Sequence, residues 1–288
     1  MSSDSFFVTG DCEDPGYRNV RDLPHLQHAR DFTESLWRRY QGYEDENFLR
    51  AAKDNFLDRF WEMYLAVTFI ECGFRISRVG NAGPEFCFTS GTQKIWVEAV
   101  APRRGIGSDS VPELLMRSDE ACEVPTEKIL LRYTNVLTEK RKKYLVALAK
   151  GIVNESDCYV LAINSRAIPH APYGNTLPFF VQALLPFGNL AVLIDPKTGD
   201  SSEPFYQRRD EITKANGFPV STAGFLDPEF SFVSLVLHSA VDCANHPAKL
   251  GGDFTILHNP SASRALGHSV FDWCEQLIYH DGALKSPF

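Results

Sequence analysis

The pattern of apolar positions changes twice in the first half of the chain. Over residues 56–73 apolar side chains recur every three or four positions, which predicts a buried helix that ends at Gly73. Three alternating runs follow, FRISRVG, PEFCFTSG and KIWVEAVAP, and the turn residues between them predict an antiparallel meander. A loop over 102–125, a helix over 126–150 and a buried strand, DCYVLAIN, complete this half.

The second half continues with mixed helix and strand patterns. We expect a helix near 177–185, a strand NLAVLID, a loop over 196–228, and strands FSFVSLVLHS and DFTILHN. The apolar segment VFDWCEQLIY predicts a final helix near 270–279, which packs internally or forms a contact in a homo-oligomer. Residues 1 to about 30 lack periodicity and read as irregular.

These elements predict an α/β protein in which one domain follows a terminal arm. We expect an N-terminal irregular and helical arm over 1–55 and a single α/β domain over 56–288. Within that domain, 56–164 forms the core and 165–288 a C-terminal α/β elaboration.

The composition fits a soluble protein. The 288 residues are 44% hydrophobic and 23% charged, and no apolar run reaches the length that a membrane-spanning helix needs. The N-terminus is acidic and polar, unlike a secretory signal, so we expect a cytoplasmic protein with no membrane partner. The seven cysteines contain no CxxC pair, which argues against a disulfide framework or a thiolate zinc site.

Positive charge is concentrated in one predicted helix. The net charge of −8 excludes a protein that coats nucleic acid with its whole surface. Between residues 126 and 151, however, seven basic residues stand against two glutamates. These basic residues are Lys128, Arg132, Lys140, Arg141, Lys142, Lys143 and Lys150.

Three glutamates are the candidates for chemistry. Alternation places Trp96, Glu98 and Val100 on one strand face, so a carboxylate stands in an apolar row and requires a partner. Glu85 begins the preceding strand, and Glu62 lies on the buried helix. Structural alternatives remain for two of them, because Glu85 is also an ordinary strand-start residue and Glu62 can lie at the polar margin of its helix.

One lysine of the basic helix is expected to face the sheet. At 100° per residue Lys140 falls in the centre of the apolar stripe, between Val136 and Tyr144. Arg132 and Lys143 lie along one margin of the stripe, and Lys142 falls away from it. The alternative for Lys140 is that its side chain extends past the stripe to solvent.

The order of these elements and acidic residues resembles the PD-(D/E)XK, or restriction-endonuclease-like, nuclease superfamily over residues 56–164. The resemblance implies an αβββαβ core with a mixed sheet and hydrolysis of phosphodiester bonds in DNA, with RNA ranked second. It implies that Glu85 and Glu98 bind Mg²⁺ or Mn²⁺. Glu62 would then complete the acidic shell, directly or through water.

The sequence departs from the superfamily pattern at two positions. Glu85 replaces the commoner Asp, and Val100 stands where the motif has its lysine. Lys140 resembles a migrated replacement for that lysine. Lys94 ranks lower, because it lies about 13 Å from Glu98 along the strand at ~3.3 Å per residue.

The resemblance also indicates how nucleic acid would be bound, and it leaves an alternative. Arg132, Lys142 and Lys143 are the candidates for contacts with phosphates, although such a cluster is also typical of a solvated helix face. The alternative function is a catalytically inactive module of the same fold that binds nucleic acid or a protein partner. A glycosidase with two catalytic carboxylates ranks last, because no pattern of sugar-stacking aromatics surrounds the glutamates.

Overall fold

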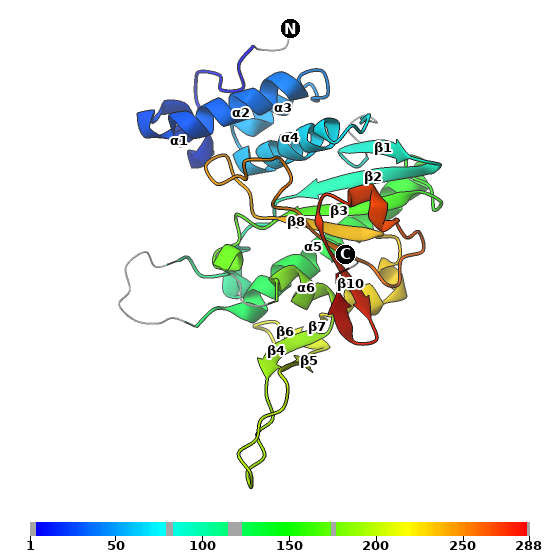
Figure 1. Cartoon of the computed structure of the whole chain (residues 1–288). Helices are drawn as coiled ribbons and strands as arrows, with labels where there is room; N and C mark the ends of the chain where they lie inside the picture. The colour runs from blue at the N-terminus through cyan, green and yellow to red at the C-terminus, as the bar shows by residue number, and fades with distance from the viewer. Residues whose placement is uncertain (1–3, 79–82, 115–122, 174–176, 287–288) are drawn as a thin grey trace.

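A mixed sheet of seven strands lies between two layers of helices in the computed structural model (Figure 1), which describes residues 4–78, 83–114, 123–173 and 177–286. The helices are α1 (Pro15–Asp22), α2 (Gln27–Tyr40), α3 (Phe48–Ala52), α4 (Phe56–Glu71), α5 (Thr126–Ala149) and α6 (Phe179–Leu184). The strands of the large sheet are β1 (Phe86–Ser90), β2 (Gln93–Val100), β3 (Cys158–Asn164), β8 (Leu235–Ser239), β9 (Thr255–His258), β10 (Glu275–His280) and β11 (Ala283–Lys285).

The strand order in this sheet is β1-β2-β3-β8-β9-β10-β11. The hairpin of β1 and β2 is antiparallel, whereas β2, β3 and β8 run parallel to one another. β9 is antiparallel to β8 and parallel to β10, and β11 closes the sheet in the antiparallel direction. The sheet is therefore mixed, as expected for an α/β protein.

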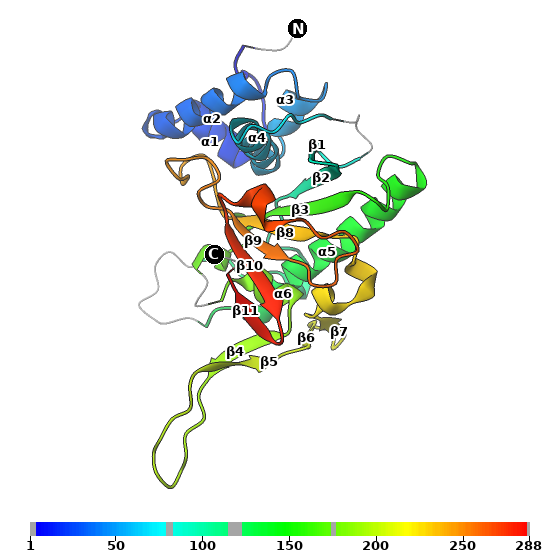
Figure 2. The same cartoon turned by 45° about the vertical axis from the view of Figure 1, so that its right-hand side comes forward.

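The two faces of the sheet are covered by different helices (Figure 2). α4 packs on one face, where Val97, Val160 and the helix residue Phe60 belong to one buried cluster, and the N-terminal helices pack on α4. The indole Nε1 of Trp61 donates a hydrogen bond to the carbonyl of Ala162 at 3.1 Å, which fixes α4 against the middle of the sheet. α5 and α6 cover the opposite face.

The start of the chain is more regular than its pattern indicated. The interpretation of residues 1–30 as irregular is wrong for α1 and for the beginning of α2. Asp14 caps α1 by accepting hydrogen bonds from the backbone of Gly16 at 2.8 Å and of Tyr17 at 3.2 Å. Pro15 follows as the first helical residue, a favourable position because proline lacks the N–H that a first turn leaves unbonded.

The elements around the candidate glutamates are close to those expected. α4, β1, β2, α5 and β3 are confirmed, and Gly73 follows α4 with a φ of 87°. The first strand of the expected meander is reduced to an isolated bridge between Ser77 and Cys87. Its last two residues, 79–80, and the segment 115–122 of the expected loop lie outside the described residues.

The predicted final helix is wrong. Residues 275–280 form β10, preceded by a short 3₁₀ turn, His268–Phe271. β10 pairs with β9, and the Gln276 side chain donates to the carbonyls of His268 and Phe271 at 2.9 and 2.8 Å. Pairing within the sheet therefore overrides the helical spacing of this segment.

The expected loop over 196–228 is also partly wrong. It contains β5 (Phe205–Arg208), β6 (Glu211–Thr213) and β7 (Pro219–Ser221), and β5 pairs with β4 (Phe187–Ala191). Figure 1 shows the β4–β5 hairpin projecting away from the two layers. No helix among the described residues is long and apolar enough to cross a bilayer.

The packing between α4 and the segment after β8 provides a test of the fold. A Cβ atom on Gly251 would lie 2.4 Å from the Trp273 ring and 2.7 Å from the Thr68 methyl group, whereas one on Gly73 would meet nothing within 4 Å. Both glycines have positive φ, so alanine costs about 1 kcal/mol at either position. We predict that Gly251→Ala lowers the free energy of unfolding by about 1–3 kcal/mol more than Gly73→Ala. Equal values in urea denaturation would contradict this packing.

Candidate active site

The β1–β2 hairpin brings two candidate glutamates together. Phe86, the first residue of β1, pairs with Val97 of β2, and this register extended by one residue beyond β1 sets Glu85 against Glu98. Residues opposite each other on adjacent strands project from the same face of the sheet. Glu98 lies within β2 and its side chain is only 4% exposed, so its charge is largely removed from water.

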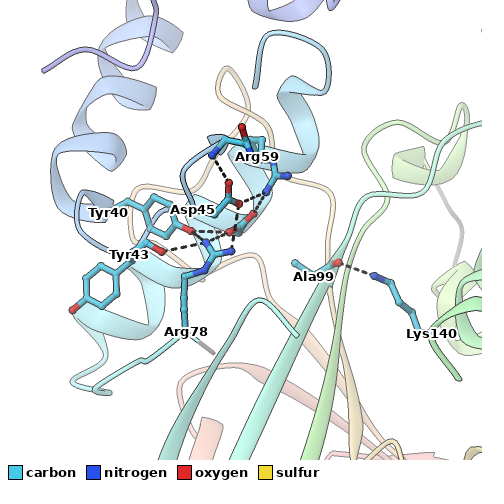
Figure 3. Close-up of polar contacts among 9 residues, drawn as sticks. Tyr40, Tyr43, Asp45, Arg59, Arg78, Ala99 and Lys140 are labelled. Carbon is cyan, nitrogen blue, oxygen red and sulfur yellow. Dashed lines mark hydrogen bonds and ion pairs between the residues drawn. The ribbon is translucent and has the colours of Figure 1, made fainter. Parts of the chain in front are cut away.

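Lys140 neutralises the buried carboxylate from the facing helix. The Lys140 side chain is 8% exposed, and Nζ forms an ion pair with Glu98 Oε1. Nζ also donates a hydrogen bond to the Ala99 carbonyl at 3.1 Å (Figure 3). The expectation that Lys140 points at the sheet is confirmed, and the alternative that it extends to solvent is wrong.

Two further groups approach Glu98. Burial, followed by the charge of Glu98, raises the pKa of Tyr159. The Tyr159 hydroxyl therefore stays protonated and donates to Glu98 Oε2 at 3.4 Å. The exposed Lys143 ammonium lies 3.7 Å from Glu98 Oε1. Glu98 thus lies between a buried cation, an exposed cation and a neutral donor.

Glu85 is the least satisfied of the three carboxyl groups. Its Oε2 atom is buried and has no hydrogen-bond partner among the described residues. Burial and, next, the Glu98 carboxylate raise the pKa of Glu85 to about 8, while Lys140 acts in the opposite direction. A buried acceptor without a donor is costly, and a cation would relieve that cost.

These groups border a pocket of about 250 Å³ between α4, α5 and the end of β2. Glu62, Glu85 and Lys140 contribute to its walls. Arg59 and Lys143 add two more cations. Four residues of the predicted site therefore line one pocket: Glu62, Glu85, Lys140 and Lys143. Glu98 is connected to this pocket by its ion pair with Lys140.

Glu62 differs from the other two glutamates because its charge is already matched. Oε1 accepts from the Tyr40 hydroxyl at 2.7 Å and contacts Arg78, and Oε2 accepts from Arg59 at 2.7 Å (Figure 3). The same two arginines lie 3.4 and 3.6 Å from Asp45. The Glu62 side chain is buried, so the alternative that it lies at the polar margin of its helix is wrong.

The three candidates for phosphate contacts are placed differently. Lys142 and Lys143 are exposed, and Lys142 pairs with Glu139 at 2.8 Å. Arg132 instead packs under the backbone of Gly105, where an added Cβ would lie 1.8 Å from its Nη1. Its Nε is buried without a partner among the described residues, and burial lowers its pKa. Of the three candidates, Lys143 lines the pocket of Glu62, Glu85 and Lys140, whereas Arg132 and Lys142 do not.

The oxygen atoms of the site suit a small, hard divalent cation. Glu85 Oε2 is unbonded, and Glu98 Oε1 and the Ala99 carbonyl converge on the Lys140 ammonium. Over the described ranges no group of three or more His, Cys, Asp or Glu side chains is placed to hold a metal ion. Two carboxylates with a carbonyl and waters match the habit of Mg²⁺, which keeps several waters and takes one or two carboxylates.

Sequence reasoning missed the residues that hold Glu62. Arg59 lies three residues before Glu62 on α4, a spacing that places the two side chains together on a helix surface. Arg78 and Tyr40 contact Glu62 from segments distant in the sequence, and no local sequence pattern predicts these contacts. Tyr159 was recognised only as part of a buried strand.

Comparison with known proteins adds no assignment. No family model matches the chain, and neither a curated protein nor a solved structure matches it. The function is therefore argued from the geometry and chemistry of the site.

The Glu98–Lys140 pair predicts unequal effects of two lysine substitutions. Lys140→Met leaves the Glu98 carboxylate buried without its main partner, so we expect a loss of about 3 kcal/mol in the free energy of unfolding. Lys142→Met removes only an exposed pair with Glu139, and its cost should stay below about 1 kcal/mol. Chemical denaturation of both variants tests this, and similar losses would show that the buried pair does not hold α5 on the sheet.

The raised pKa of Glu85 predicts how stability depends on pH. The folded protein binds a proton at Glu85 up to about pH 8, whereas the unfolded chain releases it near 4.5. Because the native state holds more protons in this window, wild-type stability falls as pH rises through it. Glu85→Gln removes that contribution, so the stability of the variant relative to wild type should rise by roughly 5 kcal/mol across the window. A constant difference between the two unfolding profiles would contradict the assignment.

Proposed function

We propose that this chain is a metal-dependent nuclease-like protein that hydrolyses phosphodiester bonds of DNA, with RNA as the second candidate substrate. The observation that carries the proposal is the opposition of Glu85 and Glu98 across the hairpin, with Lys140 reaching them from α5. The order α4, the Ser77 bridge, β1, β2, α5 and β3 supports a restriction-endonuclease-like αβββαβ core.

The surroundings of each residue indicate its role in the proposed reaction. Glu85 and Glu98 would hold the cation, and Mg²⁺ or Mn²⁺ bound there would supply Lewis-acid stabilisation and an activated water. Lys140, which reaches Glu98 from α5, would offset the charge that develops on the phosphate. Because Lys140 comes from α5, the function does not require a lysine at Val100.

The remaining charged groups act on the substrate or support the pocket. Lys143 lies at the rim, within reach of a phosphate approaching Glu98. Glu62 holds Arg59 and Arg78 in place, and in this assignment it acts on the site electrostatically rather than as a direct ligand.

A second candidate is a catalytically inactive module of the same fold that binds nucleic acid. One observation favours it: Lys140 already satisfies Glu98. This candidate predicts binding that is insensitive to metal and is weakened steeply by salt through Lys142 and Lys143.

Calorimetric titration of Mn²⁺, with oligonucleotide cleavage measured on the same samples, tests the proposal. We predict that Glu98→Gln, which preserves side-chain shape, lowers Mn²⁺ affinity at least about tenfold. Cleavage should fall by about 10²- to 10³-fold. Glu139→Gln, an exposed glutamate on α5, should change neither.

Two outcomes would contradict the proposed metal-dependent nuclease activity. Equal Mn²⁺ affinity in wild type and Glu98→Gln would remove Glu98 from the metal site. Absence of both Mn²⁺ binding and cleavage in wild type, with salt-sensitive nucleic-acid binding retained, would favour the inactive module.

A further inference from the structure

A second pocket, of about 330 Å³, adjoins Glu98 on the other side of Lys143. Its walls are mostly apolar and include Pro84, Val146, Ala147 and Tyr159. Lys142 and Lys143 also line it, and both of these side chains are exposed. Lys143 lines both this pocket and the pocket that holds Glu85. We refer to the second one as the apolar pocket.

The chemistry of the apolar pocket matches one nucleotide. A base has two flat faces that pack against apolar side chains, and polar edges that need a donor or an acceptor. Val146 and Ala147 offer the apolar surface, and the buried Glu98 carboxylate lies at its inner end. A phosphate attached to that base would meet the ammonium groups of Lys142 and Lys143, which line the same pocket as Glu98.

Val146 is an apolar residue that α5 leaves half exposed at the pocket. Its side chain is 52% exposed, and it lines the pocket together with the charged side chains of Lys142 and Lys143. Leu145, the adjacent residue, is similarly exposed at 45% but does not line the pocket. The two residues therefore share helix, exposure and apolar character, and they differ in their relation to the pocket.

We propose that the apolar pocket receives a nucleobase of single-stranded nucleic acid, so that the adjoining phosphodiester lies against Glu98 and Lys140. This inference rests on the proposed nuclease function. A base inside a duplex is stacked and paired and has to be extruded before it enters such a pocket, whereas a single strand presents its bases freely. The substrate class is therefore single-stranded nucleic acid in preference to duplex.

Binding without metal tests the inference separately from cleavage. We would measure fluorescence anisotropy of a labelled single-stranded oligonucleotide, a hairpin duplex and a single strand with abasic positions, all at one salt concentration in chelator. Wild type should bind the single strand about tenfold more tightly than the duplex or the abasic strand, as expected for one stacked base.

Val146→Glu and its matched control Leu145→Glu add the same charge to neighbouring exposed positions. Val146→Glu should lose about tenfold in affinity for the single strand, and Leu145→Glu no more than about threefold. The preference for the single strand over the abasic strand should disappear only in Val146→Glu.

Three results would overturn the inference: equal effects of the two variants, equal wild-type affinity for single strand and duplex, or no wild-type binding to either. Cleavage in Mn²⁺ separates the two proposals. If wild type cleaves and Glu98→Gln does not, while Val146→Glu and Leu145→Glu bind alike, the base pocket fails and the nuclease assignment stands.

Discussion

A carboxylate within a buried strand requires a cation, and in this chain Lys140 supplies it to Glu98. The requirement ties α5 to the sheet at one rotation, because only that rotation directs Lys140 between Glu98 and the Ala99 carbonyl. The same rotation leaves Lys143 exposed beside Glu98, where it borders two pockets. A buried charge pair is weak evidence for stability, since apolar residues of similar size commonly serve as well. The proposed chemistry of the pocket gives this pair a role other than stability.

The three glutamates show how one residue type acquires different roles from its surroundings. Two guanidinium groups and a tyrosine hydroxyl match the Glu62 carboxylate, so Glu62 has little left to offer a metal. Glu98 is matched by a lysine that can move on a long side chain. Glu85 has an unbonded oxygen and a raised pKa, and it gains most from a divalent cation. The proposal of Glu85 and Glu98 as the ligand pair therefore rests on how many partners each carboxylate already has, in addition to their proximity.

Local patterns predicted the elements that carry the site, because each has a strong period of its own. The inward direction of Lys140 follows from helical spacing, and the hairpin of β1 and β2 follows from two alternating runs separated by turn residues. The helix predicted for the C-terminal segment is wrong because Leu277 and its neighbours have helical spacing locally but pair with the edge of β9 as a strand. Asp14 followed by Pro15 is a local signal for the start of α1, although the segment lacks a helical apolar period. The arginines around Glu62 depend on tertiary contacts that no local period encodes.

The most direct test of this account is an anomalous diffraction map of the protein crystallised with Mn²⁺. The account predicts one manganese peak bonded to Glu85 and Glu98, with the Lys140 ammonium displaced from Glu98 Oε1. A map with no peak there, in which Lys140 keeps its ion pair with Glu98, would contradict the assignment of this pocket as a metal-dependent catalytic site.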